Sequence, residues 1–233
     1  TAKESGRTMG KLIIIEGGDG SGKATQTRKL WERLMDEGIK VMKVEFPNYA
    51  SPSSSLVTMY LAGEFGTDPK AVNPYAASTF FAVDRYASYK TLWGKFYHSG
   101  GIILSDRYTT SNMIHQAVKL KDQESWEEYL NWLKDFEYRL LGLPKPDMVV
   151  YLNMPPEYSQ AFIAQRADKS AVSDKDIHEK DFAYLEEAYE NAQRVRTREQ
   201  WVNIDCFSSG RLKTIEEIHQ EIYLAVKDIV SSE

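Results

Sequence analysis

A glycine-rich segment between an apolar run and a helical pattern constrains this chain more than any other feature. The segment is Glu16-Gly17-Gly18-Asp19-Gly20-Ser21-Gly22-Lys23-Ala24-Thr25, and the four residues from Leu12 to Ile15 that lead into it are all apolar. Such a run suits a strand that is buried on both faces, as in a parallel sheet. Gly17, four further residues and then Gly22-Lys23 match the spacing of a phosphate-binding loop between a strand and a helix. The segment therefore predicts an α/β fold with an anion site at the start of its first helix.

Each part of this loop has a physical role in holding phosphate. Glycines let successive backbone N–H groups turn toward phosphate oxygens, and the helix N-terminus adds the positive end of its dipole. Lys23 supplies a full charge for the β- and γ-phosphates. The alternative, a turn that binds nothing, fits poorly with four glycines and a lysine at this spacing. The loop alone would suit an ATPase, a GTPase or a kinase. We expect it to bind its nucleotide, which is ATP in an ATPase or a kinase, through Gly17, Gly18, Asp19, Gly20, Ser21, Gly22, Lys23, Ala24 and Thr25.

The loop departs from the usual pattern at one position. The residue after the lysine is ordinarily a serine or threonine whose hydroxyl binds Mg²⁺. Here that residue is Ala24, and Thr25 comes one position later. We therefore expect phosphates, water and either Asp106 or Asp19 to hold the ion.

Strands and helices alternate along the rest of the chain. Apolar runs predict further strands at residues 39–46, 102–104, 148–152 and 201–204. Helical patterns follow the glycine-rich loop up to Gly38 and recur at 73–98, at 111–141 with a break near Lys121, at 177–198 and, as a closing amphipathic helix, at 215–229. This alternation predicts a three-layer α/β/α fold, with about five parallel strands flanked by helices. The polar stretch from Asp168 to Asp176 is the best candidate for a mobile loop.

Composition excludes several classes of protein. A formal net charge of −5 argues against a nucleic-acid binder. The single Cys206 excludes an intramolecular disulfide framework, and the four histidines lack metal-ligand spacing. Apolar runs are too short for a membrane span and no signal peptide is visible. We expect a soluble, cytoplasmic protein whose residues 9–233 form one domain, with residues 1–8 an artificial extension.

Four motifs, in order along the chain, resemble the thymidylate kinase family of P-loop nucleoside monophosphate kinases. They are Glu-Gly-x-Asp-Gly-x-Gly-Lys in the glycine-rich loop, Glu45-Phe46-Pro47-Asn48-Tyr49, Phe80-Phe81-Ala82-Val83-Asp84-Arg85 and Ser105-Asp106-Arg107-Tyr108-Thr109-Thr110-Ser111-Asn112. The resemblance covers nearly the whole chain. It implies a P-loop NTPase fold with a mobile lid, in an enzyme that transfers the γ-phosphate of ATP to dTMP with Mg²⁺ for dTTP synthesis. It also implies a homodimer.

The candidate base-binding residues fit thymine independently of the family. Phe81 and Arg85 are four residues apart, so they share one face of a helix. The ring can stack on a base while the guanidinium donates to O4 of thymine, where cytosine carries an amino donor. Asn112 could accept from thymine N3–H. Phe81 considered alone would be better interpreted as a core aromatic residue, but the resemblance assigns base binding to all three.

The resemblance places further residues around the acceptor phosphate and sugar. Arg107 matches the arginine that contacts this phosphate, and Asp19 the aspartate that helps position it. Arg107 also follows a strand, at the end of the sheet where ligands bind. The other substrate residues implied are Phe46, Pro47, Tyr49, Ser111, His115 and Gln116. His115 stands where relatives carry a tyrosine credited with excluding the ribose 2′-hydroxyl, so discrimination against ribose is open.

The resemblance also implies a lid at about residues 166–180. Gly20 follows Asp19, so the phosphate loop supplies no arginine and the lid should supply the cation for the transferred phosphoryl group. Arg166 is our first candidate and Lys169 the second, with Lys175 also available; solvated surface charge is the alternative for both lysines. Asp176 and Glu179 resemble the acidic motif after the lid, near the sugar hydroxyl or metal. The expected catalytic set is Lys23, Asp19, Arg107 and Arg166.

Three other functions remain open from the sequence. The chain could phosphorylate another deoxynucleotide or a deoxynucleoside, for which Glu45 is the one obvious carboxylate base. It could be a regulatory ATPase that acts as a switch, although the complete base-binding set argues against this. It could also be a pseudo-kinase, because Ala24 and the arginine-poor lid weaken the usual machinery.

Overall fold

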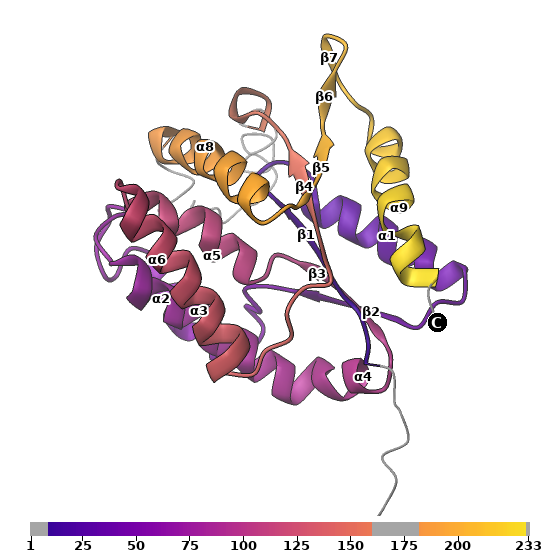
Figure 1. Ribbon diagram of the computed structural model, residues 1–233, viewed down its shortest axis with the longest axis horizontal. Helices are drawn as coiled ribbons and strands as arrows, with labels where there is room; N and C mark the ends of the chain where they lie inside the picture. Colours follow the sequence, from indigo (N-terminus) through magenta and orange to yellow (C-terminus); the bar gives the residue numbers. More distant parts are fainter. Residues whose placement is uncertain (1–8, 160–181, 232–233) are drawn as a thin grey trace, which may run out of the picture.

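The computed structural model describes residues 9–159 and 182–231 (Figure 1). Its centre is a sheet of five strands in the order β2-β3-β1-β4-β5, in which every neighbouring pair runs parallel. The strands are β1 (Leu12–Gly17), β2 (Val41–Glu45), β3 (Ile102–Asp106), β4 (Met148–Asn153) and β5 (Val202–Asp205). The five predicted strands and their parallel arrangement are confirmed.

Helices cover both faces of this sheet (Figure 1). They are α1 (Lys23–Asp36), α2 (Ser55–Leu61), α3 (Pro74–Ser88), α4 (Gly94–His98), α5 (Thr109–His115), α6 (Gln123–Lys134), α8 (Phe182–Arg198) and α9 (Ile215–Ser231). Short 3₁₀ turns, η1 (Pro52–Ser54) and η3 (Ala117–Lys119), precede α2 and follow α5. Single π-helical segments, η2 (Tyr89–Trp93) and η4 (Asp135–Leu140), extend α3 and α6. The three-layer α/β/α fold is therefore confirmed.

Alternate residues of the central strand face the two helical layers. Ile13 and Ile15 pack with residues of α1 and α9 in one core cluster. Leu12 and Ile14 pack in a second cluster with aromatic residues of η2 and α4, including Trp93. All four side chains are fully buried. A strand between two layers must be apolar at every position, which explains the uninterrupted run at its start.

Helix α9 lies along α1, and several contacts join the two. The side-chain amide of Gln26 donates to the carbonyl oxygen of Ile215 at 2.9 Å. Lys29 pairs with Glu216 at 2.8 Å, and the guanidinium of Arg33 lies 3.2 Å from the ring centre of Tyr223. The last helix of the chain thus supports the helix that begins at the phosphate-binding loop.

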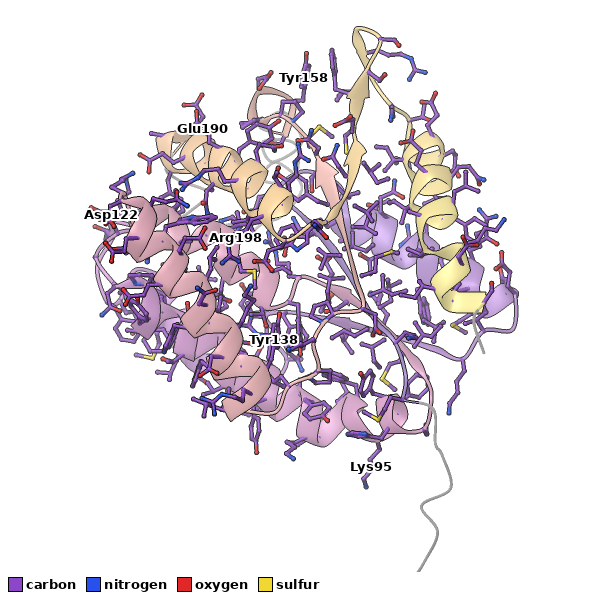
Figure 2. All side chains as sticks on the ribbon, in the orientation of Figure 1. Lys95, Asp122, Tyr138, Tyr158, Glu190 and Arg198 are labelled. Carbon is purple, nitrogen blue, oxygen red and sulfur yellow. The ribbon has the colours of Figure 1, made fainter. Side chains whose placement is uncertain are left out.

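The helices differ from expectation in a few places. The segment predicted at 111–141 breaks between α5 and α6, close to Lys121 as expected. Helix α2 and the hairpin β6 (Phe207–Ser208)–β7 (Arg211–Leu212) were not predicted. Tyr158 stacks on Phe207 of this hairpin, with ring centres 4.7 Å apart (Figure 2). The closing amphipathic helix begins at Ile215, which is 53% exposed because it occupies the first turn.

Some predictions fall outside the described residues. These are the extension at 1–8, the lid at about 166–180 and the first part of the helix predicted at 177–198. Within residues 9–159 and 182–231, no helix combines the length and apolar character needed to cross a membrane.

Candidate active site

The side chain of Lys23 folds back over the glycine-rich loop. Strand β1 ends at Gly17 and α1 begins at Lys23, so the loop joins a central strand to a helix N-terminus. Gly22 precedes the helix with a φ of 88°, in the left-handed region that favours glycine. The Lys23 Nζ donates to the carbonyl oxygen of Gly18 at 2.7 Å, and burial, with the charge of Arg107 second, lowers the pKa of Lys23. A phosphate oxygen would offer this ammonium group a stronger acceptor than a carbonyl.

Arg107 lies opposite the loop, among acidic and hydroxyl groups. Its Nη2 donates to Asp19 Oδ1, and its Nη1 donates to Ser111 Oγ at 3.1 Å. The backbone of Arg107 has a φ of 66°, which is strained for a residue with a side chain. Its carbonyl oxygen accepts from Ser105 Oγ at 2.6 Å. This turn, at the carboxyl end of β3, places the guanidinium beside the glycine-rich loop.

Glu16, which was not among the predicted site residues, is a buried carboxylate close to both Lys23 and Arg107. Its Oε2 accepts from Thr110 Oγ1 at 2.7 Å and from Ser111 Oγ at 2.8 Å. Its Oε1 accepts from the backbone N–H of Gly17 at 2.9 Å and lies 3.7 Å from Arg107 Nη1. Glu16 thus ties the glycine-rich loop to the start of α5. An acidic residue at the end of an otherwise apolar strand is the signal that could have revealed it.

A cavity of about 360 Å³ opens beside these groups. It brings together all ten described residues that were expected to bind substrate: Phe46, Pro47, Tyr49, Phe81, Arg85, Arg107, Ser111, Asn112, His115 and Gln116. From the glycine-rich loop it includes Asp19, Gly20, Gly22, Lys23 and Ala24. Leu61 and Tyr108, which were not predicted, also line it, as do Glu45 and Asp106. Segments distant in sequence therefore share one concave site at the carboxyl ends of β1, β2 and β3.

Arg85 lies at one end of this cavity and is almost completely buried. Its side chain forms an ion pair with Glu137, which is 0% exposed and belongs to η4. Burial alone would lower the pKa of Arg85, but the charge and hydrogen bonds of Glu137 raise it above its ordinary value. Phe81, one turn earlier in α3, lies with its ring edge-on to Tyr60, at 6.1 Å between ring centres. The predicted sharing of one helix face by Phe81 and Arg85 is consistent with their lining the same cavity.

Glu137 was missed because its neighbours are highly charged. It lies within Lys134-Asp135-Phe136-Glu137-Tyr138-Arg139, which resembles an exposed helical segment. The available signal was positional. The buried residues Trp126, Leu130 and Leu133 form one stripe of α6, and Glu137 continues their spacing. An acidic residue in line with an apolar stripe would have indicated a buried carboxylate with a cationic partner.

His115 and Gln116 line the cavity at the end of α5, where helix α8 is attached. The carbonyl oxygen of His115 accepts from Tyr184 Oη of α8. Asn191, also in α8, donates to the carbonyl oxygens of Met113 at 3.0 Å and Ile114 at 2.7 Å. The helix that follows the predicted lid therefore holds the last turn of α5 in place.

Two carboxylates in the cavity could take part in holding a divalent cation. Asp19 and Asp106 both line it, together with Lys23. Among the residues that the structure describes, no group of three or more histidines, cysteines or acids is arranged to bind a metal. One or two carboxylates combined with nucleotide phosphates and water is the usual environment of Mg²⁺, so the donor set fits that ion.

Five of the predicted site residues belong to one segment between β4 and α8 in the sequence. Arg166, Lys169, Lys175, Asp176 and Glu179 all fall in residues 160–181, outside the described part of the chain.

Comparison with known proteins gives one consistent result. The family model described as thymidylate kinase matches residues 15–222. The thymidylate kinase of Mycobacterium tuberculosis is 33% identical over 171 residues, covering 73% of this chain and 78% of that protein. Those of Plasmodium falciparum and Homo sapiens are 28% and 27% identical, covering 96% and 95% of this chain and 92% of each relative.

A solved structure shares the fold. It is the thymidylate kinase from Candida albicans, which superposes with a TM-score of 0.66 at 20% sequence identity and covers 95% of this chain and 92% of that one.

Proposed function

This chain belongs to the thymidylate kinase family, and from that premise we propose which residues of its cavity bind ATP, dTMP and Mg²⁺. The enzyme transfers the γ-phosphate of ATP to dTMP, giving dTDP and ADP. The observation that carries this assignment is the family match over residues 15–222. In support, the phosphate-binding loop and the candidate base-binding residues open into one cavity.

The phosphate-binding loop holds the donor. Backbone N–H groups around Gly20 and Gly22 and the start of α1 receive the phosphates of ATP. Lys23 exchanges its bond with the Gly18 carbonyl for the β- and γ-phosphates. Because this ammonium group is already buried, it loses little solvation when the nucleotide arrives, and its charge is available where negative charge shifts during transfer.

Arg107 holds the acceptor phosphate. In the described structure its guanidinium is paired with Asp19. A dianionic phosphate competes for the same guanidinium, so Asp19 becomes available to position the phosphate through the metal or a sugar hydroxyl. No general base is required, since the attacking phosphate oxygen is already anionic. Catalysis then consists mainly of alignment and charge neutralisation.

Phe81, Arg85 and Asn112 select the base. Phe81 stacks on thymine, Arg85 donates to O4 and Asn112 accepts from N3–H. The remaining substrate contacts are assigned to Phe46, Pro47, Tyr49, Ser111, His115 and Gln116, all of which line the same cavity.

Mg²⁺ fits this site as the partner of the nucleotide phosphates. Asp106 and Asp19 would hold it, since Ala24 has no hydroxyl to offer. When bound, the ion neutralises the phosphates and polarises the group being transferred. For the segment outside the described residues we propose that Arg166, or else Lys169 or Lys175, supplies the lid cation, and that Asp176 and Glu179 lie near the sugar or the metal.

We further propose that residues 9–233 act as one domain in a cytoplasmic homodimer whose partners are small nucleotides rather than nucleic acid. Val83 and Tyr86 lie close together on α3, and are 45% and 38% exposed. Exposed apolar side chains on one helix favour a contact between subunits. The net charge of −5 argues against nucleic acid.

Release of ADP from ATP tests the function directly, with dTMP, dUMP, UMP, dCMP, dGMP and thymidine as separate acceptors, with and without Mg²⁺. We expect Mg²⁺-dependent turnover that is fastest with dTMP, slower with dUMP and negligible with dCMP and thymidine. Appreciable use of UMP would trace to His115. Binding of ATP without turnover on any acceptor would contradict the assignment and favour a switch or a pseudo-kinase.

A further inference from the structure

The ion pair between Arg85 and Glu137 fixes the guanidinium in two places. Arg85 Nε donates to Glu137 Oε2 at 2.8 Å, and Nη2 donates to Oε1 at 2.5 Å. Glu137 Oε2 also accepts from Thr109 Oγ1 at 2.7 Å. A two-point contact between a carboxylate and a guanidinium sets the plane of the guanidinium as well as its position.

This arrangement determines which N–H groups Arg85 can offer to a ligand. Nε and one N–H of Nη2 are used by Glu137, and Nη2 also donates to Asn112 Oδ1 at 2.8 Å. For Nη1, the partner within the described residues is the carbonyl oxygen of Tyr108, at a long 3.4 Å. The nitrogen that remains for a ligand that reaches Arg85 from the cavity is therefore Nη1.

The same contacts determine the orientation of the Asn112 amide. Arginine only donates hydrogen bonds, so the atom that faces Arg85 must be the amide oxygen. The other end, Nδ2, donates to Ser78 Oγ at 3.2 Å. Asn112 is 2% exposed and lines the cavity. Its oxygen retains a second lone pair and can accept from a ligand, while the NH₂ end of the amide donates one of its two N–H groups to Ser78.

The network as a whole presents a donor and an acceptor to one base. A pyrimidine with a 4-oxo group and an N3–H is complementary to a donor at Arg85 and an acceptor at Asn112. Cytosine has an amino group and a bare N3 at those positions, and it would face two repulsive contacts. Glu137 would not itself contact the base. It holds Arg85, which supplies the donor and also orients the Asn112 oxygen that serves as the acceptor.

We propose that Glu137 is the positioning residue that makes this site selective for 4-oxo pyrimidines, acting through Arg85 and Asn112. The inference rests on the proposed roles of Arg85 and Asn112 in base binding. A structural role alone, in which Glu137 merely neutralises a buried arginine, would affect stability but not the choice between bases. The measurement that separates the two is the ratio of kcat/KM for dTMP to that for dCMP.

The main variant is Glu137→Gln, which keeps the size of the side chain and removes its charge. We expect its KM for dTMP to rise about tenfold, the size of one charge-assisted hydrogen bond, with the KM for ATP unchanged. The dTMP/dCMP ratio should fall by about tenfold or more, because glutamine offers the guanidinium one acceptor oxygen instead of two, so that Arg85 can rotate and release the amide of Asn112. Glu137→Asp keeps the charge but shortens the side chain, so it should fold and give an intermediate loss of selectivity.

The matched control is Leu133→Ala, one turn earlier on the same buried stripe of α6. It should lower the melting temperature while leaving the dTMP/dCMP ratio within about twofold of wild type. Glu137→Gln that is destabilised but keeps the wild-type ratio would overturn the proposal, as would full selectivity in Glu137→Asp if Glu137→Gln fails to fold. Absence of turnover with dTMP in the wild type would instead reject the proposed function.

Discussion

Two residues of the cavity depart from the usual pattern at their positions: Arg107 in its backbone conformation and Ala24 in its lack of a hydroxyl. Arg107 has a left-handed backbone, which costs an ordinary residue roughly 1–2 kcal/mol. The bond from Ser105 Oγ to its carbonyl oxygen and the contact with Asp19 help to hold it there. Strain retained at a residue that lines the cavity indicates that the direction of its side chain matters more than local stability.

Because Ala24 has no hydroxyl, a single substitution at this position should strengthen Mg²⁺ binding. Ala24→Ser restores a hydroxyl at the position where this loop usually ligates the ion. We expect the Mg²⁺ concentration for half-maximal activity to fall by roughly threefold to tenfold, equivalent to about 1 kcal/mol. Steady-state turnover with dTMP, measured against free Mg²⁺ at saturating ATP, checks this.

Thr25→Ala is the control for this change. The cavity lining includes Ala24 but not Thr25. Removal of the Thr25 hydroxyl should therefore leave the Mg²⁺ dependence unchanged. A stronger effect from Thr25→Ala than from Ala24→Ser would mean that Thr25 has taken over the ligand's role.

The residues that could be predicted from the sequence differ from those that could not in how far away along the chain their bonding partners lie. Lys23, Arg107 and Arg85 belong to motifs whose spacing is visible along the chain. Glu16 stands in the first motif, but its partner Thr110 lies 94 residues away, and Glu137 lies 52 residues from Arg85. No local pattern encodes such pairings, because they depend on how β1 lies beside α5 and how α3 lies beside η4.

At the scale of elements, helix α3 carries two of the proposed base-binding residues, and its first turn is stabilised by Asn73. The Asn73 side chain accepts from the backbone N–H of Ala76 at 2.8 Å, and Pro74 occupies the first helical position. We expect Asn73→Ala to lower the free energy of unfolding by about 1 kcal/mol. Urea unfolding should show a lower midpoint with an unchanged slope.

Asn73→Asp is the matched control, since aspartate caps equally well and should stay within a few tenths of a kcal/mol of wild type. The KM for dTMP should not change in either variant, because Phe81 lies two turns further along the helix. An equal loss in both variants would show that the cap contributes nothing.

Elements with a continuous apolar run or several periodic turns could be predicted from the sequence, and elements with neither could not. The strands and the helices α1, α3, α6 and α9 have periodic or continuous apolar patterns that span several turns or a buried run. Helix α2 has seven residues and the β6–β7 hairpin has two residues in each strand. Such segments are too short to show a period, and contacts with the rest of the molecule determine them. The π segments η2 and η4 likewise leave no sequence signature.

For the whole molecule, Lys119 should make stability depend on alkaline pH. Its Nζ donates to the carbonyl oxygen of Val72 at 2.7 Å, and burial, partly offset by Asp68, lowers the pKa of Lys119 to about 8. Between this value and the unfolded pKa of about 10.4, only the unfolded chain keeps the proton, so the free energy of unfolding rises with pH. Below pH 8 Lys119 is charged in both the folded and the unfolded chain. The folded state is then destabilised by the full free energy of burying that charge.

Comparison with Lys119→Met isolates this contribution from other titrating groups. From pH 7.5 to 10 the wild type should gain about 1–3 kcal/mol relative to the variant, allowing for the part of the side chain that solvent still reaches. Urea unfolding at several pH values measures the difference. Lys119→Arg, which does not lose its proton in this range, should reveal the same gain in the wild type. A flat difference in both comparisons would contradict the expectation.

The packing of α9 against α1 has a consequence for synthesis. The helix that begins at Lys23 is made before its partner, Ile215–Ser231, which follows every other described element along the chain. Until then the apolar side of α1 and one face of the sheet lack their cover, since Ile218, Ile222 and Val226 complete that core. A nascent chain on the ribosome therefore carries its whole phosphate-binding loop long before it can stabilise it. Chaperones would meet that uncovered face, and nucleotide binding should begin only once the helix Ile215–Ser231 has left the exit tunnel.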